Sequence, residues 1–246
     1  MIKSVAIIGA GNVGLYLYSA FKKKEIDCRI FSRQGNQQTE KLNSFKGDVD
    51  LCLICIPDDS IAELSARLPI CKGILAHSSG TVPLDALAEK HPQRAIFYPP
   101  MSLHPDADTG VEKITFCLEA NKEDALLKLE KFCQQYQLSS ARLNSQDRAS
   151  LHLAAVISHN FSNYLYHLSF SILKEKNLSL ELLKPLLVEQ VKQINNCDPA
   201  ERQTGPAQRK DFATLQKHLS LLTDESSQAI YKLISNAILG DNEEKL

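Results

Sequence analysis

A stretch near the start of the chain decides the fold: Val5-Ala6-Ile7-Ile8-Gly9-Ala10-Gly11-Asn12-Val13-Gly14. Its apolar half predicts a buried strand, and its glycines fit the pattern G-x-G-x-x-G at the point where a helix begins. The first glycine forms a tight turn, the second admits a pyrophosphate to the backbone, and the third lets helix and strand pack closely. Free amides at the helix start then attract the phosphates. We therefore expect a dinucleotide to bind at Gly9, Ala10, Gly11, Asn12, Val13 and Gly14; the alternative is a glycine-rich turn without a ligand.

The end of the next predicted strand, at residues 28–32, indicates which dinucleotide binds. An NAD site usually places Asp or Glu about 20 residues after the glycines, where the carboxylate binds the ribose 2′-hydroxyl. Here Ser32-Arg33 stands in that place, and the next carboxylate is Glu40. A guanidinium and a hydroxyl suit a 2′-phosphate, so NADP(H) is predicted in preference to NAD(H). The alternative is that Arg33 is a surface charge and that either cofactor binds.

Two composition regimes predict two domains. Up to residue 144, short apolar runs alternate with helical patterns, which is typical of βαβ units, whereas helical periodicity dominates from residue 145. The predicted fold class is α/β, with a Rossmann-like parallel-sheet domain at 1–144 and an all-helical domain at 145–246. Strands are predicted at 5–8, 28–32, 51–56, 74–77, 95–98, 115–118 and 138–143, and helices at 13–24, 121–136, 148–174, 179–195, 210–222 and 226–239.

Composition and charge exclude several classes of protein. The 246 residues are 43% hydrophobic and 23% charged, which is globular composition. A net charge of −1 gives no footprint for nucleic acid or an anionic membrane. The apolar start is too short and too polar to span a bilayer or to act as an export signal, so we expect a cytoplasmic protein with reduced cysteines. No cluster has metal-ligand spacing, and Cys52 and Cys55 are expected to be buried on opposite faces of one strand.

Polar residues follow two further strands of the predicted sheet. Open α/β sheets bind ligands at the carboxyl ends of their strands, so Ile56, Pro57 and Asp58, and also His77 and Ser78, are expected to lie beside the cofactor. For Asp58 the alternative, which we favour and which is compatible with that role, is a cap for the helix starting at Ser60. For the His77-Ser78-Ser79-Gly80 segment, the alternative is an ordinary turn in which a serine caps the backbone.

The helix predicted at 148–174 carries a polar stripe. At 100° per residue, about one third of its circumference holds His152, His159, Asn160, Asn163 and His167. The opposite side is apolar, so the stripe is expected to form one wall of a wet cleft; a structural role for each histidine is the alternative. Farther along, Thr204-Gly205-Pro206 interrupts the helical pattern, either as an inter-helix loop or as a turn that presents Thr204 to a neighbour.

These motifs together resemble a bacterial family that joins a Rossmann-like NADP-binding domain to a helical domain of unknown function 2520. The resemblance rests on the glycine turn, Pro57-Asp58-Asp59, His77-Ser78-Ser79-Gly80, Phe97-Tyr98-Pro99-Pro100-Met101, Leu151-His152-Leu153-Ala154-Ala155 with Asn160, and Thr204-Gly205-Pro206 ahead of Arg209 and Asp211. It implies an NADP-dependent oxidoreductase that forms a homodimer through its helical domains. The wider group contains pyrroline-5-carboxylate reductase, ketopantoate reductase and β-hydroxyacid dehydrogenases.

Two departures from that group bear on the chemistry. Many of its members use a Lys and an Asn on the first interdomain helix, whereas this chain has His152 and Asn160 there and no lysine between Arg148 and Lys174. Family members often carry His-Pro where Tyr98-Pro99 stands.

The predicted activity is hydride transfer between NADP(H) and a small carbonyl, hydroxy-acid or imine substrate. His152 is predicted as the general acid, while Asn160 and Ser79 are predicted to bind the developing charge. Candidate substrate contacts are His159, Asn163, Thr204 and Gly205. The alternative function is a non-catalytic NADP(H)-binding sensor, which the missing lysine favours.

Overall fold

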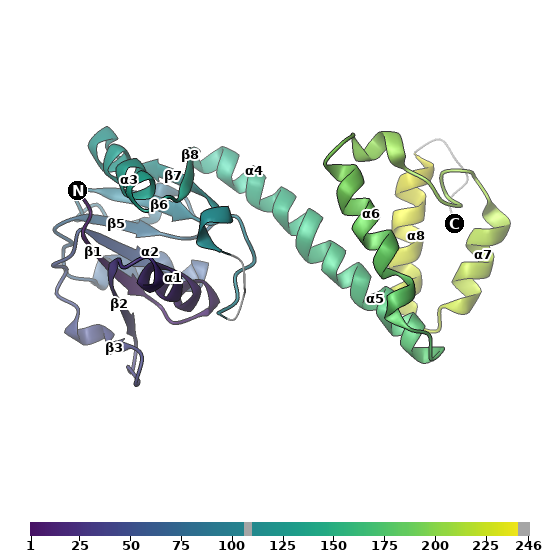
Figure 1. Cartoon of the computed structure of the whole chain (residues 1–246), viewed down its shortest axis with the longest axis horizontal. Helices are drawn as coiled ribbons and strands as arrows, with labels where there is room; N and C mark the ends of the chain where they lie inside the picture. The colour runs from purple at the N-terminus through teal and green to yellow at the C-terminus, as the bar shows by residue number, and fades with distance from the viewer. Residues whose placement is uncertain (106–109, 241–246) are drawn as a thin grey trace. The chain divides into compact units, whose positions relative to one another are not determined.

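The computed structural model describes residues 1–105 and 110–240 and divides into two compact units, residues 1–160 and 161–246 (Figure 1). The unit boundary lies within a helical segment, whereas the predicted domain boundary at 144–145 lies where the strands end. The boundary at 160–161 lies where contacts between the two units are few. The predicted boundary at 144–145 lies where the composition of the sequence changes. A domain boundary at 144–145 stays a prediction.

One eight-stranded sheet forms the centre of the first unit, with the strand order β3-β2-β1-β4-β5-β6-β7-β8. Neighbouring strands are parallel except for the antiparallel pair β6 and β7. The predicted α/β, Rossmann-like fold is confirmed, although the antiparallel pair and the short β3 were not predicted. The strands are β1 Ser4–Ile8, β2 Asp27–Ser32, β3 Glu40–Lys41, β4 Leu51–Ile54, β5 Ile74–His77, β6 Arg94–Tyr98, β7 Thr115–Ala120 and β8 Ser139–Arg142.

Helices cover both faces of the sheet, because its central strands are apolar on both sides. Alternate residues of β1 and β4 face opposite layers: Ile7 and Leu53 pack with α1 and α3, whereas Ile54 packs with α2. Cys52 and Cys55 belong to these two different layers, as predicted. The helices are α1 Asn12–Lys23, α2 Ile61–Arg67, α3 Glu123–Gln135, α4 Ser145–Ala155, α5 Ser162–Glu175, α6 Lys184–Ile194, α7 Phe212–Leu221 and α8 Glu225–Leu239 (Figure 1).

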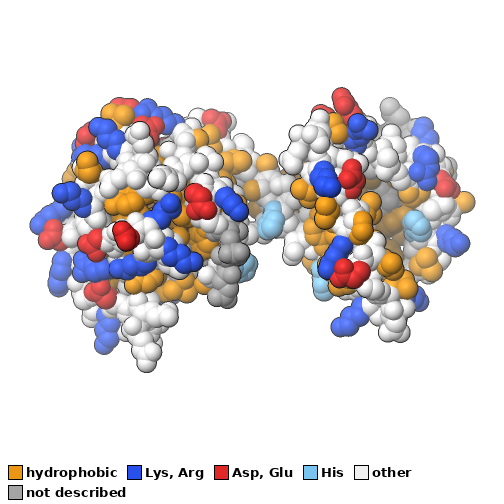
Figure 2. Space-filling model, viewed as in Figure 1, with side chains coloured by type: hydrophobic (Ala, Val, Ile, Leu, Met, Phe, Trp, Pro, Cys, Tyr) orange, Lys and Arg blue, Asp and Glu red, His pale blue; other side chains and the backbone are white. Residues whose placement is uncertain are grey.

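The second unit is helical, and little of its apolar surface is buried within the unit. Among its described residues, up to Gly240, only three apolar side chains are buried: Ala207, Leu215 and Leu219. Several apolar side chains of α6 are instead exposed (Figure 2). No helix in the described part of the chain is long and apolar enough to cross a membrane.

Candidate functional site

The glycine turn after β1 has the backbone geometry that a dinucleotide site needs. Gly9 has φ +118°, and a Cβ there would collide with the backbone of Cys55, so only glycine fits. A Cβ at Gly14 would collide with the carbonyl oxygen of Gly9, so α1 can approach β1 closely only because Gly14 has no side chain. The turn lies at the carboxyl end of β1, beside β4, where the strand order changes direction. This is the position at which such sheets bind ligands.

Gly11 leaves the start of α1 open to an anion. A Cβ at Gly11 would meet no atom within 4 Å, and no acidic residue stands in the first turn of the helix. The amide of Leu15 donates to the carbonyl of Gly11 over 2.9 Å, so the amides before Leu15 in the first turn have no acceptor within the helix. These amides and the positive end of the helix dipole fit a pyrophosphate.

Ser32 and Arg33, at the end of β2, differ in whether their hydrogen-bond donors are free for a phosphate. The hydroxyl of Thr39 donates to the side chain of Asn36 and therefore accepts from Ser32, whose oxygen lies 2.8 Å away. The hydroxyl of Ser32 also accepts from the amide of Gly35. Its single proton is thus used within the loop, which leaves none for a phosphate. Arg33 is exposed, and within residues 1–105 and 110–240 no carboxylate pairs with its guanidinium.

Asp58 connects the turns that follow β4 and β5. Its carboxylate accepts from the hydroxyls of Ser79, over 2.8 Å, and Thr81, over 2.6 Å. The helix α2 starts after Ser60 without a side-chain cap, so the predicted capping role of Asp58 is wrong. The two hydroxyls come from the turn after β5, about twenty residues away in the sequence.

The hydroxyl of Ser79 has no free donor for a substrate. It donates its proton to Asp58 and accepts from the amides of Thr81, over 3.1 Å, and Val82, over 3.0 Å. A hydroxyl has one proton and two lone pairs, so these three hydrogen bonds use its full capacity. Ser79 therefore stabilises the turn in this structure, as in the structural alternative considered for this segment.

His77 supports the same turn from beneath and is completely buried. Its Nδ1 accepts from the amide of Ser79 over 3.2 Å, so the neutral ring carries its proton on Nε2. Burial, with a smaller effect of the Arg148 guanidinium, lowers the pKa of His77 to about 4. At neutral pH the imidazole is therefore an uncharged part of the interior, not a proton donor that faces solvent.

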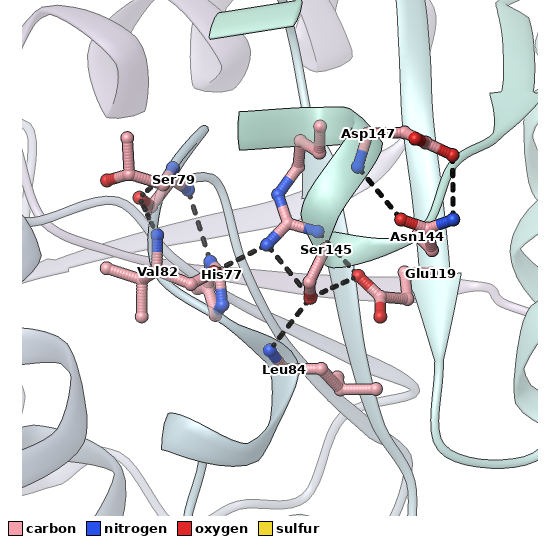
Figure 3. Close-up of polar contacts among 10 residues, drawn as sticks. His77, Ser79, Val82, Leu84, Glu119, Asn144, Ser145 and Asp147 are labelled. Carbon is pink, nitrogen blue, oxygen red and sulfur yellow. Dashed lines mark hydrogen bonds and ion pairs between the residues drawn. The ribbon is translucent and has the colours of Figure 1, made fainter. Parts of the chain in front are cut away.

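A buried guanidinium attaches the start of α4 to the sheet. Figure 3 shows the neighbouring contacts of Ser145 and Glu119. Arg148 is fully buried, and its side chain donates to Glu119 of β7 over 2.5 Å and to the carbonyl of Val82 over 2.6 Å. Ser145 donates to the same carboxylate over 2.7 Å and accepts from the amide of Leu84 over 3.3 Å. The helix itself begins where Asn144 accepts from the amide of Asp147. The first turn of α4 is thus held by β7 and by the segment that follows β5.

One helical turn after Arg148, His152 meets the carboxyl end of β6. The hydroxyl of Tyr98 lies 3.0 Å from Nδ1 of His152, and Tyr98 is only 6% exposed. Gly80, in the turn after β5, lies against both side chains, since a Cβ there would lie 2.5 Å from that Nδ1 and 2.9 Å from Cζ of Tyr98. Sequence analysis missed Tyr98 and Arg148 as parts of the site. The spacing of Arg148 and His152, four residues apart, would have placed them on one helix face.

The expected polar stripe does not continue evenly along the helix. Residues Val156–Phe161 form a π-helical segment, in which hydrogen bonds close over five residues, so the assumed 100° per residue fails there. His159 and Asn160 lie in this segment, and both are exposed. In the second unit Asn163 is also exposed, while Thr204 lines a cavity of about 300 Å³ and Gly205 has φ +105°. Roles for these residues in substrate binding stay predictions.

Comparison with protein families identifies residues 114–238 as the domain of unknown function DUF2520. The chain belongs to the DUF2520 family. The resemblance predicted from the sequence is thus confirmed. Comparison with curated proteins finds no match.

Solved structures similar to this DUF2520 protein share its whole fold. A "putative NADP oxidoreductase" from Bacteroides fragilis is 26% identical, with a TM-score of 0.88 over 97% of this chain and 98% of that one. A reductive aminase from Aspergillus terreus, in complex with NADPH and ethyl levulinate, is 15% identical, with a TM-score of 0.69 over 97% and 94%. A pyrroline carboxylate reductase from Plasmodium falciparum with NADP bound is 14% identical, with a TM-score of 0.59 over 98% and 100%.

The buried ion pair of this DUF2520 protein yields a stability prediction. Glu119→Gln removes the charge that compensates Arg148, so we expect the free energy of unfolding to fall by about 3 kcal/mol. Glu130→Gln is the matched control, because Glu130 pairs with the exposed Arg142 and its loss should have a much smaller effect. Urea unfolding of both variants measures the difference. If both variants lost the same free energy of unfolding, the buried ion pair of Arg148 and Glu119 would contribute no more to stability than the exposed pair.

His77 predicts how stability depends on pH. Its pKa is about 4 in the folded protein and about 6.5 in an unfolded chain, so between these values only the unfolded state gains a proton. Stability should therefore fall as pH is lowered from 7 to 5, by up to about 2 kcal/mol from this residue. His77→Asn keeps an acceptor for the amide of Ser79 but does not titrate, so its loss over the same interval should be smaller. Identical pH dependence of stability in denaturant titrations of the unaltered protein and of His77→Asn would show that His77 is not the group that titrates.

Proposed function

We propose that this DUF2520 protein is an NADP(H)-dependent oxidoreductase that reduces a small carbonyl or imine compound. The observation that carries the proposal is the arrangement at one edge of the sheet in the first unit. The glycine turn follows β1, and the Tyr98–His152 pair stands at the end of β6, which is parallel to β1 through β4 and β5. A phosphate-binding turn and a group that can supply a proton therefore lie at the same edge. The similarity to the NADP oxidoreductase from Bacteroides fragilis supports this proposal.

The residues at this edge fit NADP(H). The amides of the turn from Gly9 to Gly14 bind the pyrophosphate, and Arg33 binds the 2′-phosphate beside β2. From the strand order, the nicotinamide end then extends towards β4 and β5, next to Ile56, Pro57, Asp58 and Ser78. When bound, the nicotinamide supplies the hydride. Ser32 and His77, which were predicted as direct contacts, shape the loops in this proposal, because their polar atoms are buried or already paired.

His152 supplies the proton in the proposed reaction. It is partly exposed, whereas the imidazole of His77 is buried and neutral. Arg148 and Glu119 hold α4 so that His152 stays at the end of β6. Asn160 remains the proposed partner for the developing charge, whereas Ser79, whose hydroxyl is saturated, stabilises the turn.

A non-catalytic NADP(H)-binding sensor is the second candidate. It is favoured by the sequence between Arg148 and Lys174, which contains no lysine. Incubation with NADPH and a panel of 2-oxo acids and cyclic imines separates the two functions. Substrate-dependent oxidation of NADPH supports the enzyme, and tight binding without any turnover supports the sensor.

His152→Gln tests the proposed proton donor. We expect turnover with the best compound of the panel to fall roughly 10²-fold or more, because an amide hydrogen-bonds but does not transfer a proton. NADPH affinity, measured by calorimetry, should stay unchanged. His218→Gln, whose imidazole lies 2.7 Å from the Tyr231 hydroxyl within the second unit and has no proposed role in the site, is the control. Unaltered turnover in His152→Gln would remove this residue from the mechanism.

Gly11→Ala tests the cofactor site without disturbing the fold. Its Cβ would meet open space in the protein but would occupy the position of the pyrophosphate, so the thermal midpoint should hold while NADPH affinity falls at least tenfold. Arg33→Asp should weaken NADPH binding much more than NADH binding. Calorimetric titration with both cofactors measures these changes. Full NADPH affinity in Gly11→Ala would place the cofactor elsewhere.

We also propose that the helical unit forms a homodimer. Its few buried apolar residues cannot provide a core of ordinary size, and α6 exposes four apolar side chains by more than half: Leu186, Val188, Val191 and Ile194. A second copy that covers them would remove this surface from water. Cytoplasmic location likewise remains a prediction.

Light scattering tests the dimer. The purified chain should have a mass of twice 27.4 kDa, and Leu186→Glu should shift it towards a single copy because a buried charge opposes association. Leu127→Glu, at a 41% exposed site on α3 of the first unit, is the matched control. A monomer at micromolar concentration of the unaltered protein would rule out this proposal.

A further inference from the structure

We propose that Tyr98 is a positioning residue that acts through His152: its hydroxyl holds the imidazole in the tautomer with the proton on Nε2 and replaces that proton once it has been given to the substrate. The role rests on the proposed function, since His152 is the proton donor there. Tyr98 lies at the end of β6 and His152 on α4, so the pair joins the sheet to the helix that carries the donor.

The proposed hydrogen bond, from the Tyr98 hydroxyl to Nδ1 of His152, requires a protonated Tyr98. The two side chains are 3.0 Å apart, from Oη to Nδ1. Burial raises the pKa of Tyr98, with a further contribution from Cys117 of β7 and a smaller one from Asp58 after β4, while Arg148 of α4 acts in the opposite sense. The phenol therefore keeps its proton through the neutral range. A neutral imidazole can accept that proton's hydrogen bond on Nδ1 only if its own N–H is at Nε2.

Packing leaves the imidazole little freedom to exchange its two nitrogens. The rings of Tyr98 and His152 meet edge to face, with centroids 6.0 Å apart. On the other side stands Gly80, where a Cβ would lie 2.5 Å from Nδ1 and 2.7 Å from Cγ of His152. The backbone of Gly80 thus closes the space on the Nδ1 side. Nε2, at the opposite corner of the ring, is the nitrogen left for a substrate.

In the proposed proton transfer, every bond to a proton that breaks is matched by one that forms. The substrate oxygen or nitrogen that has gained an electron pair forms a bond to the proton of Nε2, and that N–H bond breaks with its electron pair staying in the ring. In the same step Nδ1 uses its lone pair to bind the proton of the Tyr98 hydroxyl, and the O–H bond breaks, so no imidazolate forms. The imidazole is again neutral, and the phenolate takes a proton from water. An alkoxide is a much stronger base than a phenolate, so the overall transfer is downhill.

This arrangement differs in pH dependence from a histidine that acts alone. An ordinary imidazolium loses its proton near pH 6.5, so a general acid of that kind becomes scarce above neutrality. A phenol with a raised pKa remains loaded across the whole neutral range. We therefore expect the rate of reduction to stay level between about pH 6 and 9.

Nitrogen-15 NMR of the imidazoles tests the tautomer without cofactor or substrate. The full chain is labelled at histidine and measured at pH 8.5, with His152→Gln used to assign the signals of His152. In the unaltered protein we expect Nδ1 to be unprotonated and Nε2 protonated. Tyr98→Phe should give a mixture of tautomers, and Tyr136→Phe, a control at a half-buried tyrosine, should leave the signals unchanged. An Nδ1–H tautomer in the unaltered protein would overturn the proposal, whether or not the protein is an enzyme.

Kinetics test the proton supply. With NADPH and the best cyclic imine or 2-oxo acid of the panel, kcat of the unaltered protein should be level from pH 6 to 9. In Tyr98→Phe it should be at least tenfold lower at pH 8 and should fall further as pH is raised, because the hydroxyl no longer replaces the donated proton. A level profile at full rate in Tyr98→Phe would refute the role of the hydroxyl. If no compound of the panel is reduced, the proposed function fails, while the NMR result still decides the tautomer.

Discussion

The buried guanidinium of Arg148 is the contact on which the candidate site depends. A charge without solvent needs a partner, and the carboxylate of Glu119 on β7, together with the carbonyl of Val82, provides it. Because these partners belong to the sheet and to the segment after β5, the first turn of α4 has one position that satisfies the cation. His152 follows one turn later on the same face, and its place beside Tyr98 is a consequence of that attachment.

Several polar residues at the strand ends form a scaffold for the groups that remain free. Ser79 donates its single hydroxyl proton to Asp58, and Ser32 donates its own to Thr39. Both hydroxyls also accept hydrogen bonds from backbone amides. Such saturated hydroxyls order the turns but offer nothing to a ligand. Among the strand ends that the structure describes, the amides at the start of α1 and the guanidinium of Arg33 are not used in this way. A binding edge of this kind depends as much on which groups are occupied as on which are present.

Sequence reasoning succeeded where the physics is local. The strand ending at Ile8 and the glycines after it predicted β1, the turn and α1 correctly, since apolar runs and glycine stereochemistry act over a few residues. It did not foresee the π-helical segment Val156–Phe161 within the polar stripe, because a constant helical period was assumed. It also failed at Asp58, which was expected to cap its own helix but is bound by Ser79 and Thr81 from another turn.

The sequence by itself determined the layered fold, the glycine turn and the family, because each is encoded in short patterns of apolar residues, glycines and motif order. Only the tertiary structure decided which polar side chains face one another at the edge of the sheet. Glu119 and Arg148, like Tyr98 and His152, are distant in the chain and meet because β6, β7 and α4 pack together. No local sequence pattern predicts these two contacts, since their energy arises from desolvation and hydrogen bonding after the elements have assembled.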